Sequence, residues 1–365
     1  MAKTILVDGN GTRLAYIDSG PPSGTVYTTI FAVHGVEFTN PIFQKVSVLC
    51  RANHVRFVAI NRREYKGSTP FTETEKAIIT NGTDTQKMNW LKDRGLEIAN
   101  FVDAFIQREN LSLVSADGKR GGVALLGWSS GATFTAAAIS NIDALPSDVR
   151  ARLVSRLRVH IMQGSLLTHL FPSMLFCILI APLAEPPSIA FGLPFPPQTF
   201  SPQIDTSIPA KARIPAFTLW ITSYFQHGDL STRDTNVLEY VLPATFRMPS
   251  IWNMSSVEIA DIIDEGPNST VETPFALNFM TQALAVYNKA TFDKSTRALL
   301  PHLKVWEISG DATASFSLAA LWSMQDDDKA HGGNNINYKI VPGANHFMHW
   351  DEPDKTVEAY LEALL

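Results

Sequence analysis

The distribution of hydrophobic and polar residues along the chain predicts alternating strands and helices. Short apolar runs at residues 3–7 and 13–18 flank the sequence Asp-Gly-Asn-Gly at 8–11, which is typical of a β-hairpin turn. Longer apolar runs without polar alternation occur at residues 26–33, 55–60, 123–126, 303–308 and 336–341. Runs of this kind indicate parallel strands that are buried on both faces of a sheet.

Segments with helical periodicity lie between these runs. The apolar residues Ile98, Phe101, Val102, Phe105 and Ile106 are spaced as on one face of an amphipathic helix. Further helices are expected at residues 42–49, 131–139, 317–324 and 356–365. The repeated alternation predicts an α/β fold, with a mostly parallel sheet flanked by helices.

The alternation stops near residue 160 and resumes at residue 303. We therefore expect residues 1–164 and 296–365 to form the two parts of one core. Residues 165–295 are expected to form a large, mainly helical cap that is inserted after the sixth strand. The chain of 365 residues then has one core and one insertion rather than two consecutive domains.

Charged residues make up 18% of the chain, against about 25% in an average soluble domain. The deficit is concentrated at residues 161–204, where the only formal charge is Glu185. Polar residues and Pro172 interrupt this stretch, so we expect a buried strand and an apolar cap segment rather than a membrane span. Contact with a membrane surface and translated non-coding sequence stay open as alternatives.

The net charge of −5 and the absence of a long basic block argue against nucleic acid as a partner. Two cysteines, Cys50 and Cys177, form neither a disulfide framework nor a CxxC pair, and the N-terminus does not have the pattern of a signal peptide. We therefore expect a cytoplasmic protein. The run at 326–328 is interpreted as a solvated helix end, and we expect neither a metal nor a cofactor.

The sequence Gly-Trp-Ser-Ser-Gly at 127–131 lies between a predicted strand and a predicted helix. A G-x-S-x-G motif in this context holds a serine on a sharp, strained turn above the sheet, and the flanking glycines avoid collisions with the backbone. Ser129 is therefore the candidate nucleophile. The N–H of Ser130, at the start of the helix, is a candidate donor to an oxyanion.

Two other segments are expected at the same edge of the sheet. His34-Gly35-Val36 follows the strand at 26–33, and the N–H of Val36 would complete an oxyanion hole. We expect the His34 side chain to be structural. His346 follows the last strand, where an imidazole can serve as general base. His349 is its competitor, and we expect His349 to lie in the turn that enters the last helix.

With these motifs, the chain resembles the α/β-hydrolase superfamily of serine hydrolases, in particular cap-bearing esterases and uncharacterised fungal members. The order along the chain, with Ser129 before His346, is also the order in that superfamily. The loop Asn-Arg-Arg-Glu-Tyr-Lys-Gly-Ser at 61–68 is similar to the family's D-x-R-G-x-G-x-S stretch. Family members that open epoxides or remove halogen use an aspartate at the elbow, so a serine argues against both reactions. The resemblance covers residues 1–160 and 296–365, and it implies a Ser-His-acid triad.

Two carboxylates are candidates for the acid of this triad. Asp311 follows the strand at 303–308, where the family usually places the acid, although the usual spacing from the glycine falls on Thr313. Glu185 is the alternative, because some members place the acid after the preceding strand. A lone carboxylate in an apolar stretch is costly to bury unless a partner such as an imidazole pairs with it.

These residues predict cleavage of a carboxylic ester, with thioesters and lactones as related substrates. We expect an apolar or aromatic small molecule, with Trp128, Phe191, Phe195 and Trp220 among the residues that bind it. Two alternatives stay open, because a fold does not determine a reaction. One is carbon-carbon bond cleavage or cofactor-free oxygenation by the same triad, and the other is a small-molecule receptor that does not hydrolyse its ligand. The sequence does not indicate an oligomeric state.

Overall fold

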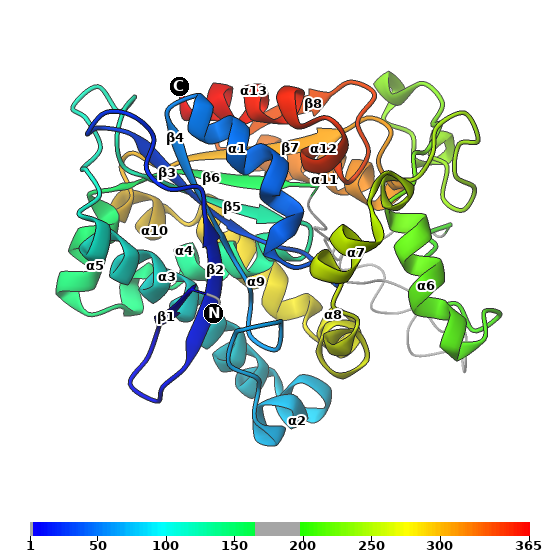
Figure 1. The fold of residues 1–365 in the computed structure, drawn as a ribbon, viewed down its shortest axis with the longest axis horizontal. Coiled ribbons are helices and arrows are strands. Elements are labelled where there is room, and N and C mark those ends of the chain that lie inside the picture. The colour runs from blue at the N-terminus through cyan, green and yellow to red at the C-terminus, as the bar shows by residue number, and fades with distance from the viewer. Residues whose placement is uncertain (1–2, 165–197) are drawn as a thin grey trace.

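The computed structural model describes residues 3–164 and 198–365 of the chain (Figure 1). Its strands form one eight-stranded sheet in the order β1-β2-β4-β3-β5-β6-β7-β8. The strands are β1 Lys3–Leu6, β2 Arg13–Asp18, β3 Thr28–Val33, β4 Val55–Ile60, β5 Val123–Trp128, β6 Leu157–Gln163, β7 Lys304–Gly310 and β8 Asn337–Val341. Pairing is antiparallel in the hairpin β1–β2 and between β2 and β4, and it is parallel from β4 to β8.

Helices cover both faces of this sheet. They are α1 Gln44–Ala52, α2 Glu73–Asn81, α3 Asp84–Glu109, α4 Gly131–Ser140, α5 Ser147–Val154, α6 Ala210–Ile221, α7 Ser256–Ile262, α8 Thr273–Asn278, α9 Met280–Phe292, α10 Lys294–Leu299, α11 Ser315–Ala330, α12 Met348–Asp351 and α13 Pro353–Leu364. Two short elements also matter for the site, the 3₁₀-helix η1 (Asn40–Phe43) and the π-helix η7 (Asn268–Glu272).

The central strands are apolar on both faces because two separate cores lie against them. In β3, Phe31 and Val33 face a core built with α3, α4 and α9, whereas Ile30 and Ala32 face a core built with α1 and α13. All six residues of β3 are buried. The predicted fold class, a mostly parallel sheet flanked by helices, is therefore confirmed.

The chain leaves the core after β6, the sixth strand, and returns at β7. The described part of this insertion, from residue 198, contains α6 to α10, with α6 at the side of the molecule in Figure 1. Not all of it is separate from the core, since α9 packs against α3 and α4. Phe275 and Phe279 contact the core residue Trp90 through their rings.

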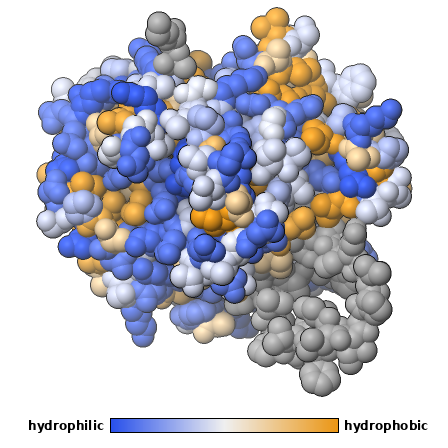
Figure 2. Space-filling view, turned by 90° about the horizontal axis from the view of Figure 1, so that it is seen from below, coloured by the Kyte–Doolittle hydropathy of each residue, from blue (hydrophilic) through white to orange (hydrophobic). Residues whose placement is uncertain are grey.

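The charge-poor segment predicted at residues 161–204 is described only at its two ends. Residues 161–163 belong to the buried strand β6, and residues 165–197 lie outside the described part of the chain. Within the described ranges, no helix combines the length and hydropathy needed to cross a membrane. In Figure 2 apolar surface is most extensive on the side where α6 lies, and the exposed side chains of Leu242, Phe246 and Trp252 belong to the insertion.

The aspartate run at 326–328 differs from its interpretation as a solvated helix end. Asp326 is exposed and pairs with Arg233 (2.9 Å), but Asp327 and Asp328 are buried near the end of α11. Asp328 accepts a hydrogen bond from the backbone N–H of Asn335 (2.8 Å). The interpretation was wrong for these two residues because the turn after α11 folds back over them.

Candidate active site

Ser129 lies on a strained turn between β5 and α4. Its φ of 54° is in the left-handed region, which non-glycine residues seldom adopt. The backbone N–H of Ser129 donates to the carbonyl of Gln163 at the end of β6 (2.9 Å), and its own carbonyl accepts from Ala132 (3.1 Å). These bonds hold the serine at the carboxyl edge of the parallel strands, where ligands of such sheets bind.

Glycines allow the backbone to pack closely around this serine. A Cβ on Gly131 would lie 2.2 Å from the carbonyl oxygen of Val33, so α4 could not begin this close to β3. A Cβ on Gly35 would lie 2.9 Å from the Cβ of Ser129 and 3.4 Å from its Oγ. The loop after β3 therefore lies directly beside the serine hydroxyl.

Hydrogen bonds orient the peptide group that joins Gly35 to Val36. The Gly35 carbonyl accepts from Arg62 Nη2 (2.8 Å) and from His34 Nδ1 (2.8 Å). His34 Nε2 accepts from the backbone N–H of Arg62 (3.1 Å), so the ring proton is on Nδ1. In a trans peptide the N–H points opposite to the C=O, so this carbonyl fixes the direction of the Val36 N–H.

The two predicted oxyanion donors make no hydrogen bond to the described part of the chain. Neither the N–H of Val36 nor that of Ser130 donates a hydrogen bond within the described ranges. Burial and the nearby Arg62 lower the pKa of His34 well below its ordinary value, so this fully buried ring is neutral. His34 thus has the structural part expected of it.

His346 lies in the loop between β8 and α12 and is almost fully buried. Its backbone carbonyl accepts from the indole Nε1 of Trp128 (3.1 Å), which ties this loop to the serine turn. The imidazole packs against the rings of Trp128 and Phe316, each with centroids 5.4 Å away. Burial in these apolar surroundings lowers its pKa to about 3, so the ring is neutral near pH 7.

The predicted acid is not hydrogen-bonded to this imidazole. Oδ1 of Asp311 accepts from the backbone N–H of Gly343 (2.6 Å), and His346 Nδ1 has no hydrogen-bond partner among the residues that the structure describes. The backbone of Gly164 lies beside that nitrogen, since a Cβ there would be 2.9 Å from Nδ1. Glu185 lies outside the described residues. Thr313, which occupies the acid position by the family's usual spacing, is buried, and its hydroxyl has no partner among the described residues.

His349 does not share the position of His346. It lies in α12, fully buried between Phe43 and Trp128, and its Nδ1 is 2.9 Å from Gln163 Nε2. Neither its ring nor that of His34 lines the pocket described next. His349 therefore belongs to the core beneath the site.

Ser129 and His346 open into one narrow, mostly apolar pocket between the core and the cap. Its lining comes from the oxyanion loop, the serine turn, the loop at 199–203, α6, α11 and the His346 loop. The lining residues are Val36, Phe38, Trp128, Ser129, Thr199, Phe200, Ser201, Gln203, Phe217, Trp220, Ile221, Phe316, His346 and Phe347.

The pocket includes two of the four predicted substrate-binding residues, Trp128 and Trp220. The other two, Phe191 and Phe195, lie outside the described ranges. Phe38 and Phe316 were not predicted, although Phe38 follows the oxyanion loop by only two residues and could have been found from that position. No signal in the sequence marks Phe316, because α11 reaches the site only through the packing of the helices.

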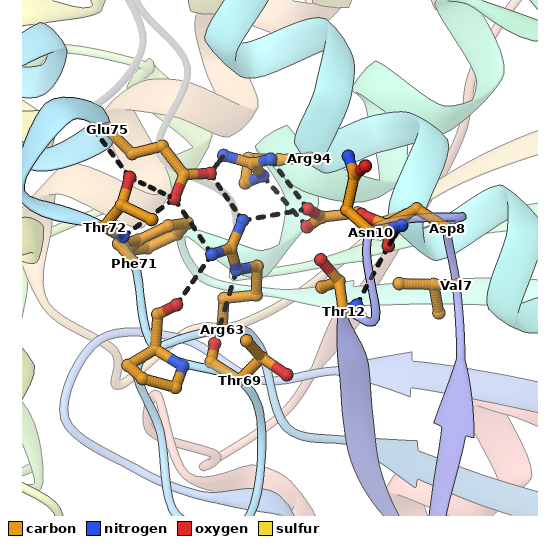
Figure 3. Close-up of polar contacts among 12 residues, drawn as sticks. Val7, Asp8, Asn10, Thr12, Arg63, Thr69, Phe71, Thr72, Glu75 and Arg94 are labelled. Carbon is orange, nitrogen blue, oxygen red and sulfur yellow. Dashed lines mark hydrogen bonds and ion pairs between the residues drawn. The ribbon is translucent and has the colours of Figure 1, made fainter.

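A second, polar hollow lies on the other side of the loop at 61–68, near the tip of the β1–β2 hairpin (Figure 3). Its arginines are paired with carboxylates: Arg63 contacts Glu75 (2.5 Å) and Glu97 (3.3 Å), and Arg94 contacts Glu97 (2.7 Å). All the N–H groups of Arg63 have partners, since the guanidinium also donates to the carbonyls of Thr69 and Pro70. This cluster fastens α2 and α3 to the loop and leaves the apolar pocket as the candidate site.

The His346 loop is also attached to the cap. Asn345 donates through Nδ2 to the carbonyl of Thr222, just after α6 (2.9 Å), and to Oγ of Ser250 (2.7 Å). Ser250 in turn donates to Asp351 in α12 (2.6 Å). The described ranges contain no group of three or more His, Cys, Asp or Glu side chains that could hold a metal ion.

Comparisons with known proteins agree with this architecture. Three solved structures align over all of this chain: a mutant epoxide hydrolase from Vigna radiata (12% identity, 98% of that chain, TM-score 0.54), an esterase from Exiguobacterium antarcticum (13%, 99%, 0.50) and a bromoperoxidase from Bacillus anthracis (13%, 99%, 0.50). No curated protein sequence matches the chain. The model of the alpha/beta hydrolase family matches residues 30–359, and the chain therefore belongs to that family.

Proposed function

We propose that this protein is a serine hydrolase that cleaves a carboxylic ester of a small, mainly apolar molecule. The observation that carries the proposal is the strained turn that places Ser129, together with His346, in one apolar pocket. Beside this turn, the N–H groups of Val36 and Ser130 have no hydrogen-bond partner among the described residues. Turnover of p-nitrophenyl esters and labelling by a fluorophosphonate probe test it. A protein that neither hydrolyses such esters nor reacts with the probe would contradict it.

In the proposed reaction, Oγ of Ser129 attacks the ester carbonyl carbon while His346 takes the hydroxyl proton. The N–H groups of Val36 and Ser130 stabilise the oxyanion of the tetrahedral intermediate. The intermediate collapses to an acyl-serine, and His346 returns the proton to the departing alcohol. Water, deprotonated by the same imidazole, then attacks the acyl carbon and releases the carboxylic acid and the serine.

The acid of a triad stays a proposal with two candidates. Asp311 is bound through Oδ1 to the N–H of Gly343, and Glu185 belongs to the part of the sequence that follows Gly164. Without either carboxylate, the ring would be oriented by packing, which includes its contacts with Trp128, Phe316 and Phe347. The pH dependence of turnover distinguishes these arrangements, because a paired carboxylate raises the pKa of an imidazole.

We expect kcat/KM for ester hydrolysis to be nearly constant from about pH 6.5 down to about pH 5. The general base must be neutral, and burial lowers the pKa of His346 to about 3, so its neutral fraction does not change over this range. An enzyme whose imidazole has an ordinary pKa of about 6.5 would be about 30-fold less active at pH 5 than at a pH where the imidazole is fully neutral. The measurement is initial rates with p-nitrophenyl butyrate across this range.

An acid limb near pH 6.5 would contradict the expected profile and would indicate a carboxylate paired with His346. The variants Asp311→Asn and Glu185→Gln then identify the partner, because only the paired one shifts the limb to lower pH when it is neutralised. Glu97→Gln provides a matched control, since Glu97 is a buried carboxylate in the arginine cluster outside the apolar pocket.

The pocket also supports a finer proposal about the substrate. Among the described residues, Oγ1 of Thr199 and Nε2 of Gln203 are buried there without hydrogen-bond partners. Leaving a buried polar group unpaired costs about 1–3 kcal/mol, so a ligand that satisfies one of them gains affinity. The lining residues that the structure describes include no carboxylate, lysine or arginine. We propose that the substrate carries an uncharged hydroxyl or carbonyl group at a distance from its ester.

The variant Gln203→Leu is expected to reduce kcat/KM about tenfold for an ester with a hydroxyl on its acyl chain, and to leave the plain acyl ester within about twofold. The leucine keeps much of the side-chain volume and removes only the hydrogen-bonding group. The measurement compares p-nitrophenyl 6-hydroxyhexanoate with p-nitrophenyl hexanoate, and Thr199→Val is tested in the same way. Equal losses for both esters would indicate a change of shape and would refute this role.

A further inference from the structure

The oxyanion loop contains an unusual turn at Glu37, the residue after Val36. The N–H of Phe38 donates to the carbonyl of Val36 (2.9 Å), which closes a three-residue turn with Glu37 at its centre. Glu37 has a φ of 72°, a value that is strained for a residue with a side chain. Contacts elsewhere must therefore hold Glu37 in this conformation.

The backbone of Glu37 is held from two sides. Its N–H donates to the hydroxyl oxygen of Tyr65 (2.9 Å), and its carbonyl accepts from the N–H of Asp264, just after α7 (2.8 Å). Tyr65 donates to Oε1 of Glu272 (3.0 Å), and Glu272 is paired with Arg62 (2.9 Å). Because Arg62 also binds the carbonyl of Gly35, one network holds both neighbours of Val36.

The side chain of Glu37 connects the same turn to the cap. Its carboxyl group is fully buried and accepts from the hydroxyl of Thr218 in α6 and from Nδ2 of Asn268 in η7 (3.3 Å). Thr218 lies between Phe217 and Trp220, and both of these line the pocket. The carboxyl group of Glu37 does not line the pocket, so contact with a ligand does not account for its burial at this junction.

We propose that Glu37 is a positioning residue that joins the oxyanion loop to the cap, so that the Val36 N–H is correctly placed only while α6 and η7 are docked on the core. This inference rests on the proposed function, because it gives the Val36 N–H a part in the reaction. Glu37 does not touch the reacting atoms and acts through the turn that it holds.

The charges around Glu37 make this junction sensitive to pH. Burial, with a smaller contribution from the nearby Glu265, raises the pKa of Glu37 to about 7 against the opposing effect of the hydrogen bonds from Thr218 and Asn268. Two further acidic residues, Glu272 and Asp264, lie near the same turn, and Arg62 is the cation of the network. Burial raises the pKa of Tyr65 well above its ordinary value, so its hydroxyl is neutral. The residue that α6 contributes, Thr218, is uncharged.

Burial therefore favours the protonated carboxyl in the folded protein, against the hydrogen bonds that Thr218 and Asn268 donate to it. Because the pKa of Glu37 is raised in the folded protein, its stabilising contribution is fully present below its ordinary pKa of 4.5 and is lost as the pH rises through about 7. We expect kcat of the wild type to fall about tenfold between about pH 6 and about pH 8.5, less than the 10²–10³-fold cost of losing a whole oxyanion donor.

The test compares Glu37→Gln, which resembles the protonated form, with Glu37→Leu, which removes the hydrogen bonds. With p-nitrophenyl butyrate, Glu37→Gln should retain the wild-type kcat at about pH 6 and lose the decline above pH 7. Glu37→Leu should lower kcat about 10- to 100-fold at every pH while KM changes less than about threefold. Glu97→Gln serves as the control and should retain the wild-type pH profile, because Glu97 lies in the arginine cluster.

A second measurement covers the case in which Glu37→Leu does not fold. Hydrogen exchange of residues 210–221 and 268–272 should become faster in wild type as the pH rises through 7, relative to Glu37→Gln at the same pH. Glu37→Gln with the wild-type decline in kcat would overturn the inference, as would equal exchange in the two proteins. If the wild type hydrolyses esters and the Glu37 variants have its kcat and its pH profile, this inference alone is overturned. If the wild type does not hydrolyse esters, the proposed function is overturned and this inference with it.

Discussion

Replacing Ser129 with alanine is expected to lower kcat/KM for ester hydrolysis by at least about 10⁴-fold and to abolish labelling by a fluorophosphonate probe. The alanine removes the attacking oxygen, and losses of about 10⁴- to 10⁶-fold follow when one member of such a group is removed from serine proteases. Initial rates with p-nitrophenyl butyrate and the mass of the labelled protein provide the two measurements.

A matched control comes from the same turn and helix. Thr133 lies in the first turn of α4 and is fully buried, and its hydroxyl has no hydrogen-bond partner within residues 3–164 and 198–365. Thr133→Val removes that hydroxyl at constant shape, so it should keep wild-type activity and labelling. Turnover or labelling that survives in Ser129→Ala would show that another group is the nucleophile.

Replacing Gly131 with alanine is expected to destabilise the fold by more than about 4 kcal/mol. The new Cβ would lie 2.2 Å from the carbonyl oxygen of Val33 and 2.7 Å from that of His34. Both atoms belong to the backbone, so β3 and α4 would have to separate. Urea unfolding of the purified variant measures the effect, and failure to obtain soluble protein is consistent with it.

Gly9→Ala is the control for this substitution, because no atom lies within 4 Å of the Cβ position at Gly9 and its φ is not positive. We expect this variant to unfold within about 0.5 kcal/mol of wild type. A Gly131→Ala protein with the urea midpoint of wild type would contradict the steric argument for the serine turn.

The features that the sequence predicted well depend on residues close together in the chain. The central strands are visible as apolar runs because they face two cores, as Phe31 and Ile30 do in β3. The serine turn is visible because its glycines and its serine are adjacent in sequence, and its steric requirements are local. Residue type and spacing are enough to infer such features.

The features that were missed depend on packing between distant segments. The position of Gly164 beside His346 Nδ1 follows from the pairing of β6 with β7, where the N–H of Gly164 donates to Ile308 (2.9 Å). No local pattern reveals this contact, so the sequence could suggest Asp311 and Glu185 as acids but could not choose between them. Glu37 meets Thr218 and Asn268 across 181 and 231 residues, and no motif marks either meeting.

Charge runs and insertions illustrate the same limit. Three consecutive aspartates are normally solvated, yet Asp327 and Asp328 are buried because the turn after α11 covers them. The expected insertion at 165–295 contains α9, which packs on α3 and α4 as a core helix. Its amphipathic pattern shows that one face is buried but does not say against which partner.

The hydrogen bonds of Asn345 have a consequence for engineering this protein. The residue before the proposed general base is bound on one side to Thr222 and Ser250 of the cap, and Ser250 is bound to Asp351 of the core. A cap grafted from another family member would have to supply a backbone carbonyl in place of that of Thr222 and a hydroxyl in place of that of Ser250, because otherwise the buried Nδ2 of Asn345 loses its acceptors. The cap and the His346 loop therefore have to be designed together, and an exchange of the cap that changes specificity has to preserve both of these acceptors.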